Sequence, residues 1–121
     1  MSMPIETELS DEIARYMDLA VGEAKLTAAN MANIDTPGYK AVGMDFEAEM
    51  REVIDDVDQG RAPQPVRVET VGGLIARPDG NDVSMDREGL NLAEAQLRLK
   101  TGVALWRVQN QEVLDAIKAD K

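Results

Sequence analysis

Apolar and small residues recur every three or four positions from Leu9 to Ile34, and no proline interrupts this stretch. Alternating steps of four and three are typical of a heptad seam, the stripe along which one α-helix faces a partner helix. Ser10, followed by two acidic residues, is suited to begin such a helix. The pattern predicts an N-terminal helix over residues 9–34, with its seam at Ile13, Met17, Ala20, Ala24, Thr27, Met31 and Ile34.

The same rhythm returns at the other end and predicts a C-terminal helix over residues 84–118. Its seam is Leu92, Gln96, Leu99, Val103, Trp106, Asn110, Val113 and Ile117. Trp106 is expected to anchor the packing. The two amides of the seam leave two interpretations open, because a buried amide fixes register whereas an amide at the edge is simply solvated. Two long helices joined by a short excursion should pair as an antiparallel coiled coil. One pair leaves part of each helix uncovered, so a repeated assembly would supply further helices.

Residues 35–83, between the helices, combine turns with short elements. Pro37 and Gly38 suit the central positions of a type II turn. A middle helix is expected from about Met44 to Asp58, with Phe46, Met50, Val53 and Val57 on one face. Residues 66–71 alternate like a strand, and turn signals at 72–73 and 78–81 predict a small β-hairpin between them. The expected fold is therefore mainly α, and 121 residues suit a single domain spanning 1–121.

Composition and charge exclude several classes of function. The formal net charge is −10, with 14 acids and 4 bases in residues 1–60. This balance disfavours nucleic-acid binding, which requires clustered Lys and Arg. The chain has no cysteine and no histidine, so disulfides, thiolate ligands and imidazole ligands are excluded. The acidic run at residues 55–60 lacks the spacing of a calcium loop, and no phosphate-binding loop is present. We therefore expect no enzyme, no cofactor, no metal and no small-molecule substrate.

The N-terminal residues contain no apolar core typical of a secretory signal, and no stretch reaches the length of a membrane span. If the chain leaves the cytoplasm, we expect it to use a route that reads no cleaved signal.

The most specific motif follows the first predicted helix. It is the run Ala29-Asn30-Met31-Ala32-Asn33-Ile34-Asp35-Thr36-Pro37-Gly38-Tyr39-Lys40. An Asn-x-Ala-Asn run followed by Thr-Pro-Gly-Tyr at the end of a heptad helix resembles the signature of the flagellar rod, hook and hook-associated proteins. The segments 44–47, 80–88 and 92–98 are similar to those of the small proximal-rod subunits of the B type. The C type is the alternative, because Ala95, Leu99 and residues 41–43 depart from the B pattern.

The resemblance implies a structural subunit of the proximal rod of the bacterial flagellum, located in the periplasm and exported by the flagellar type III apparatus without a cleaved signal. Implied partners are copies of itself, other rod subunits, the rod–ring adaptor protein and the export apparatus. It also implies that the terminal helices are loosely ordered in the free monomer. The alternative is a helical adaptor or chaperone of a secretion system, which would bind partners through the same seams.

The residues of the signature have predicted local roles, with Pro37 and Gly38 setting the turn. Asn30 and Asn33 are expected to bond carbonyls freed at the helix end. Thr36 is expected to leave helical geometry because a proline follows it. Tyr39 is expected to pack its ring on the helix pair and keep its hydroxyl in water. Either these residues form an assembly site, or they only cap the helix; both interpretations can hold together.

Overall fold

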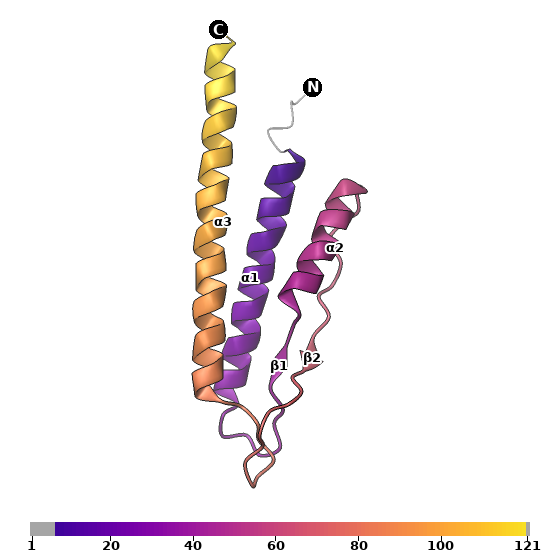
Figure 1. The fold of residues 1–121 in the computed structure, drawn as a ribbon, viewed down its shortest axis with the longest axis vertical. Helices are drawn as coiled ribbons and strands as arrows, with labels where there is room; N and C mark the ends of the chain where they lie inside the picture. Colours follow the sequence, from indigo (N-terminus) through magenta and orange to yellow (C-terminus); the bar gives the residue numbers. More distant parts are fainter. Residues whose placement is uncertain (1–6, 121) are drawn as a thin grey trace.

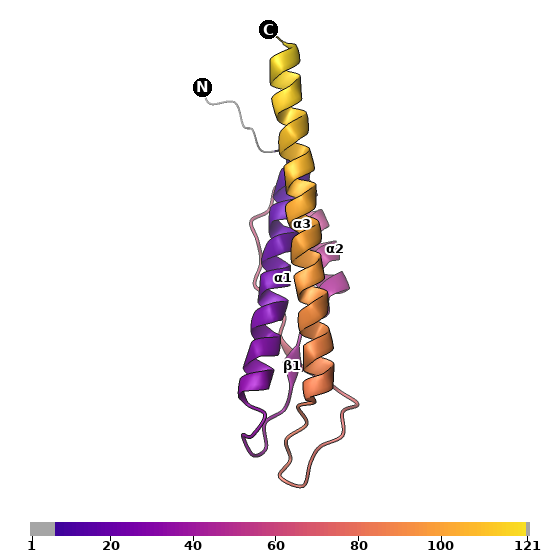
Figure 2. The ribbon, with the colours of Figure 1, turned by 90° about the vertical axis from the view of Figure 1, so that its left-hand side faces the viewer.

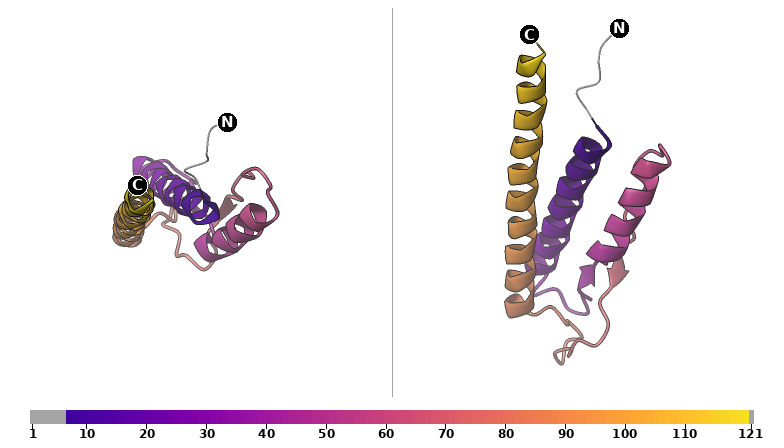
Figure 3. Two further views of the ribbon diagram at one scale, coloured as in Figure 1. Left: turned by 90° about the horizontal axis from the view of Figure 1, so that it is seen from above. Right: turned by 45° about the horizontal axis from the view of Figure 1, so that its top comes forward.

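Three helices and a two-stranded sheet make up the fold in the computed structural model, which describes residues 7–120 (Figure 1). The elements in order are α1 (Glu8–Ala32), β1 (Val42–Gly43), α2 (Phe46–Asp58), β2 (Glu69–Thr70) and α3 (Met85–Ala119). α1 lies between α3 and α2 (Figure 3). None of the described helices is both long and apolar enough to cross a membrane. The predicted fold, two long terminal helices with a short middle helix and a small sheet, is confirmed.

α1 begins earlier than predicted because Thr7, not Ser10, is its N-cap. The Thr7 hydroxyl accepts the backbone N–H of Ser10 at 3.1 Å, and the Thr7 carbonyl accepts the N–H of Asp11 at 3.0 Å. Ser10 is therefore inside the first turn, where it is buried. The helix ends at Ala32 with Asn33 as its C-cap, two residues before the predicted end. Both Thr and Ser favour N-caps, so sequence preference alone could not choose between them.

α1 and α3 run antiparallel along most of their length, as Figures 1 and 2 show. Residues early in α1 meet residues late in α3. The contacts that define this register are Gln109 with Thr7, Gly102 with Tyr16 and Met17, Arg98 with Glu23, and Glu88 with Asn30. A Cβ at Gly102 would lie 2.4 Å from Met17 Cγ, which shows how closely the two backbones approach there. The glycine therefore permits this approach.

The face that α3 turns toward α1 differs from the predicted seam. Its buried residues are Glu88, Ala95 and Gly102, which are seven residues apart. The predicted seam lies on the flank of this face: Gln96 is exposed and Val103 is 37% exposed. Small residues allow the closest helix approach, so they occupy the centre of the contact. The polar Gln96 is thus at the solvated edge, the second of the two interpretations left open.

α3 also extends beyond α1. Gln109 contacts Thr7, the first residue described before α1, and α3 continues to Ala119 (Figure 1). We call residues 110–119 the overhang. They carry the end of the predicted seam, including Asn110, Val113 and Ile117.

α2 covers α1 on the side away from α3. It begins at Phe46, two residues later than predicted, because the Asp45 carboxylate accepts the N–H of Ala48 at 3.0 Å and caps the helix. Phe46 and Val57 are buried. Met50 and Val53 pack against the buried cluster that Phe46 forms with α1. The predicted apolar face of the middle helix is confirmed.

The sheet pairs different segments from those predicted. β2 is antiparallel to β1, with Val42 opposite Thr70 and Gly43 opposite Glu69. The predicted hairpin after Gly72-Gly73 is therefore wrong. The segments that enter and leave α2 lie side by side. The strand-like residues after α2 therefore pair with residues before α2, and not with residues after Gly72-Gly73. Residues 77–81 form a separate turn, closed by the Arg77 N–H donating to Asn81 O at 2.8 Å.

Candidate functional site

The signature motif lies where the end of α1, β1 and the start of α3 meet. The loop of residues 33–41 lies against residues 77–83, and we call this region, together with Asn30 and Glu88, the signature junction. Four of its polar residues are buried: Asn30, Asn81, Asp82 and Glu88. Buried polar groups are costly unless they are hydrogen-bonded, so their partners decide what the junction does.

Asn30 joins three elements through its amide. Its Nδ2 donates to Glu88 Oε1 at 2.7 Å and to Val42 O at 2.8 Å. Its Oδ1 accepts the N–H of Val42 at 2.9 Å. The amide thus pairs with both backbone groups of Val42, as a neighbouring strand would, and ties α1 to β1 and α3. The predicted role, bonding carbonyls at the end of α1, is wrong for Asn30.

Glu88 is 0% exposed, and its carboxylate has two polar partners, Asn30 and Arg87. Beside the bond from Asn30, its Oε2 lies 3.2 Å from Nη1 of Arg87. A buried carboxylate held by an amide and a guanidinium fixes the start of α3 against the end of α1. A bond to a charged group contributes more than one between neutral groups.

The carbonyls at the end of α1 are bonded instead by Asn33 and by residues from before α3. Asn33 Nδ2 donates to Ala29 O at 2.8 Å, as predicted. Asn81 Nδ2 lies 2.8 Å from Asn33 O, 3.1 Å from Ile34 O and 2.9 Å from Thr36 O. Its Oδ1 accepts the N–H of Val83 at 2.8 Å. Asn81 therefore caps the helix end from a distant part of the chain.

Two further residues hold the loop to the chain before α3. Asp82 Oδ1 accepts the N–H of Ala41 at 2.7 Å. Arg77 donates to the carbonyls of Ile34 and Val83. Hydrophobic periodicity gave no sign of Asn81, Asp82, Arg77 or Glu88, because it detects apolar faces only. Two signals pointed to this segment: the resemblance of residues 80–88 to the rod subunits, and the Pro-Asp-Gly-Asn turn, in which the Asp79 carboxylate accepts the N–H of Asn81.

The turn itself has the geometry expected of it. Gly38 has φ = 76°, and the N–H of Tyr39 donates to Thr36 O at 3.2 Å. A positive φ at the third residue of a four-residue turn, directly after a proline, is characteristic of a type II turn. Thr36 also donates its hydroxyl to Asn33 Oδ1 at 3.0 Å. Pro37 and Gly38 are both exposed on the outside of the junction.

Tyr39 is half-buried, and its hydroxyl lies 3.4 Å from Asn30 Oδ1. The hydroxyl thus has a partner within the chain that was not predicted, and it ties Tyr39 to the amide of Asn30. Together these contacts set the direction in which the chain leaves α1 and enters α3.

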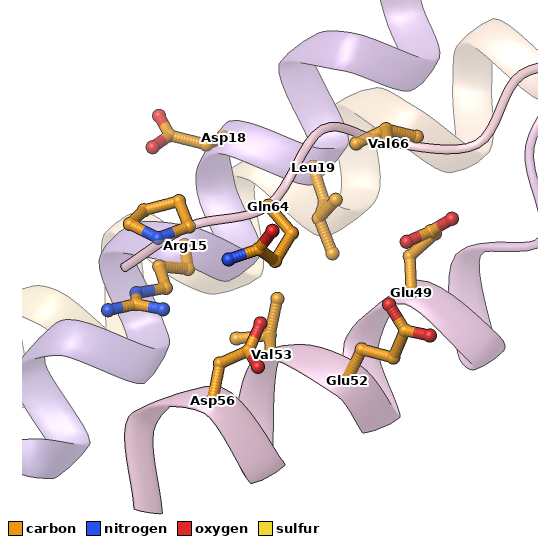
Figure 4. A pocket seen from close by; sticks show the side chains of 10 residues that line it. Arg15, Asp18, Leu19, Glu49, Glu52, Val53, Asp56, Gln64 and Val66 are labelled. Atoms are coloured by element: carbon orange, nitrogen blue, oxygen red, sulfur yellow. The ribbon is translucent and has the colours of Figure 1, made fainter. Parts of the chain in front are cut away.

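A cleft between α1, α2 and the returning chain is a second candidate site (Figure 4). Leu19, Val53 and Val66 line it, and acidic side chains surround them. Two of these acids bind arginines of the returning chain. Glu49 accepts from Arg67 and Asp56 accepts from Arg61. The bonds raise the pKa of both guanidinium groups above its ordinary value, through Glu49 for Arg67 and through Asp56 and then Asp55 for Arg61.

These acids therefore act as ties that hold residues 61–67 along α2. A general acid or base needs a group free to exchange a proton with a substrate. The geometry of the cleft supports packing rather than catalysis.

The third feature is the flank of α3, where most of the predicted seam lies. Leu92, Trp106 and Val113 are half-buried, whereas Leu99, Val103 and Ile117 are exposed. On α1, Ile13 and Ala20 are buried; Met17, Ala24 and Met31 are half-buried. The helix pair thus buries part of the α1 seam and leaves Leu99, Val103 and Ile117 of α3 exposed. We call these three residues the α3 stripe.

Comparison with known proteins decides between the families that such a helix pair could belong to. The chain matches no model of a known protein family. It is 32% identical over 107 residues to the flagellar basal body rod protein FlgB of Cereibacter sphaeroides, covering 78% of this chain and 82% of the relative. The chain belongs to the FlgB family. The FlgB of Yersinia enterocolitica is 28% identical over 123 residues, covering 84% of this chain and 88% of the relative. That of Borrelia hermsii is 29% identical over 110 residues, covering 74% and 82%.

The predicted resemblance to the B type of rod protein is confirmed, since these relatives carry that name. The relatives are named as rod proteins of the flagellar basal body, and nothing favours the adaptor or chaperone. In this FlgB-family chain, the signature junction joins α1, β1 and α3 through buried polar side chains, and apolar side chains of α3 are left exposed.

Proposed function

We propose that the chain is a structural subunit of the proximal rod of the flagellar basal body. It would assemble by helix packing with copies of itself and other rod subunits, and so transmit torque. The observation that carries the proposal is the match to FlgB proteins over more than three quarters of the chain. No catalytic role is part of the proposal.

The structure supports a mechanical role in two ways. The signature junction ties the end of α1 to the start of α3 through buried side chains, which makes one stiff hairpin of the two long helices. The uncovered stripe of α3 then offers a surface for neighbouring helices. A load applied along α3 passes into α1 through the Asn30–Glu88 bond and the Arg98–Glu23 ion pair, whose atoms are 2.7 Å and 2.6 Å apart.

The proposal also includes specific partners. In the proximal rod, the chain would contact the rod–ring adaptor protein on one side and further rod subunits on the other. Export by the flagellar type III apparatus without a cleaved signal would bring the subunit to the periplasm. The overhang, which continues past the contact of Gln109 with Thr7, would become ordered only on assembly.

Complementation tests the proposal. Cells that lack their own copy of this gene should be non-motile and should form no external filaments, and expression of the chain should restore both. An empty vector is the negative control. Restored motility is the expected result, whereas normal motility in the deletion strain would overturn the proposal. A cytoplasmic chaperone would restore export but would not itself appear in the periplasmic fraction, which immunoblotting of the fractions distinguishes.

A further inference from the structure

An apolar groove runs between α1 and α3, and no residue of α2 or of the strands lines it. Its walls consist mainly of Ala20, Val21, Ala24, Ala28, Leu92 and Leu99. Val21 and Leu99 are both more than a third exposed, so the groove is open to solvent. Solvent-exposed apolar surface of this kind marks an interaction site.

The shape of the groove fits an α-helix. Three of its wall residues on α1 are alanines at positions 20, 24 and 28, four residues apart, so they line up along one face. Small side chains in a row let a third helix approach closely. On α3, Leu92 and Leu99 of the wall are seven residues apart, the repeat that a helical partner requires.

The overhang is a helix without a partner in the described chain. Residues 110–119 are about 15 Å long at about 1.5 Å per residue. Leu114 and Ile117 are 50% and 51% exposed and stand three residues apart, so they share one face. The molecule thus presents an open groove along the helix pair and an overhanging apolar helix beyond the end of the pair.

The charges around the two surfaces are complementary. Lys25 lines the groove. Lys100 and Arg107 follow Gln96 at the fourth and eleventh positions, so they stand along the same edge of the groove. No ion pair between described residues involves these three bases. The overhang carries two acids, Glu112 and Asp115, against one base, Lys118, and the C-terminal end of its helix adds a partial negative charge.

We propose that the overhang of one copy of this chain docks into the α1–α3 groove of a second copy. The contact joins different surfaces of the two copies, so it repeats in one direction and builds a ring or a helical array rather than a closed dimer. The proposal rests on the proposed function and specifies the contact through which it would assemble. Because all copies are acidic overall, the basic edge of the groove also selects the orientation in which they meet.

A single contact of this kind is weak. Ten residues of helix bury less than the roughly 1,000 Å² that a stand-alone complex needs. The contact therefore forms where subunits are concentrated, as at the growing end of an assembly. This calls for a test that captures a transient contact.

Cross-linking provides this test, because the chain contains no cysteine. Ala28→Cys places a thiol in the groove, and Leu114→Cys places one on the overhang. The control is Ile75→Cys, at a side chain that is 94% exposed in the loop between β2 and α3, far from the C-terminus (Figure 1). Each variant is purified, one partner carries a tag, and disulfide formation in equimolar mixtures is followed over a concentration series.

We expect the mixture of Ala28→Cys with Leu114→Cys to cross-link about tenfold faster than that of Ile75→Cys with Leu114→Cys, because docking raises the effective thiol concentration. Lys25→Glu in the groove partner should remove most of this advantage, and Asp115→Lys in the overhang partner should restore it. Equal rates in the two mixtures, or faster pairing of Ala28→Cys with itself, would overturn the proposal.

The motility assay separates this inference from the proposed function. If the single-cysteine variants restore motility but show no preferential cross-link, the docking contact is wrong and the rod assignment stands. If the unmodified chain fails to restore motility, the rod assignment itself fails.

Discussion

Replacing Asn30 with alanine should destabilise the fold more than any other single change in the signature. The change removes the 2.7 Å bond to the Glu88 carboxylate and both bonds to the backbone of Val42. A bond to a charged group is worth about 1.5–3 kcal/mol and a neutral one about 0.5–1.5 kcal/mol. Val42 is half-buried, so water replaces part of the hydrogen bonding that its backbone N–H and carbonyl lose. We expect a loss of about 3–5 kcal/mol in the free energy of unfolding.

The matched control is Asn33→Ala, in the same motif. The Asn33 side chain makes two neutral bonds, to Ala29 O and from the exposed Thr36 hydroxyl, and the residue is half-buried, so its loss should be about 1–2 kcal/mol. Urea unfolding followed by far-UV circular dichroism measures both variants against the unmodified chain. Glu88→Gln keeps an acceptor for Asn30 and should cost less than Asn30→Ala. A loss for Asn30→Ala no larger than that for Asn33→Ala would refute the central position of this amide.

Three further changes test other parts of the structure. Asn81→Ala should lower the free energy of unfolding by about 2–4 kcal/mol, since the buried N–H of Val83 loses its partner and three carbonyls each lose one of their donors; urea unfolding measures it, and a loss below that of a surface change would refute its capping role. Gly102→Val should destabilise the α1–α3 pair by about 1–3 kcal/mol, because its Cβ would meet Met17 Cγ. Gly89→Ala, with nothing within 4 Å, should stabilise α3 by up to about 1 kcal/mol in the same melt, and equal effects at the two glycines would contradict the close approach. Gly38→Val should impair motility in the complementation assay more than it lowers expression, because φ = 76° is strained by about 1–3 kcal/mol in a β-branched residue; normal motility would show that the turn does not set subunit geometry.

The helices could be predicted from the sequence because their apolar repeats are long. The face of α3 that meets α1 could not, because two different stripes run along this helix. The more apolar one, with Leu99 and Val103, dominates the sequence pattern. The closest contact is made by the stripe with Ala95 and Gly102, whose small side chains carry little hydrophobic signal but let the backbones meet.

Only the local part of the signature junction could be predicted from the sequence, because its other contacts join residues far apart along the chain. The turn at Pro37-Gly38 follows from backbone preferences that two residues encode locally. The capping of α1 by Asn81 depends on a contact across 45 or more residues, which no local pattern contains. β2 likewise pairs with a strand before α2, and strand alternation alone does not name a partner.

The most direct test of the account is to isolate hook–basal bodies from cells in which this chain is the only copy of its kind. Quantitative mass spectrometry would then measure whether the chain is present in them. The account predicts that the chain co-purifies with the basal bodies in a fixed ratio to the other rod subunits and withstands a high-salt wash. Its absence from purified basal bodies of motile cells would contradict the account.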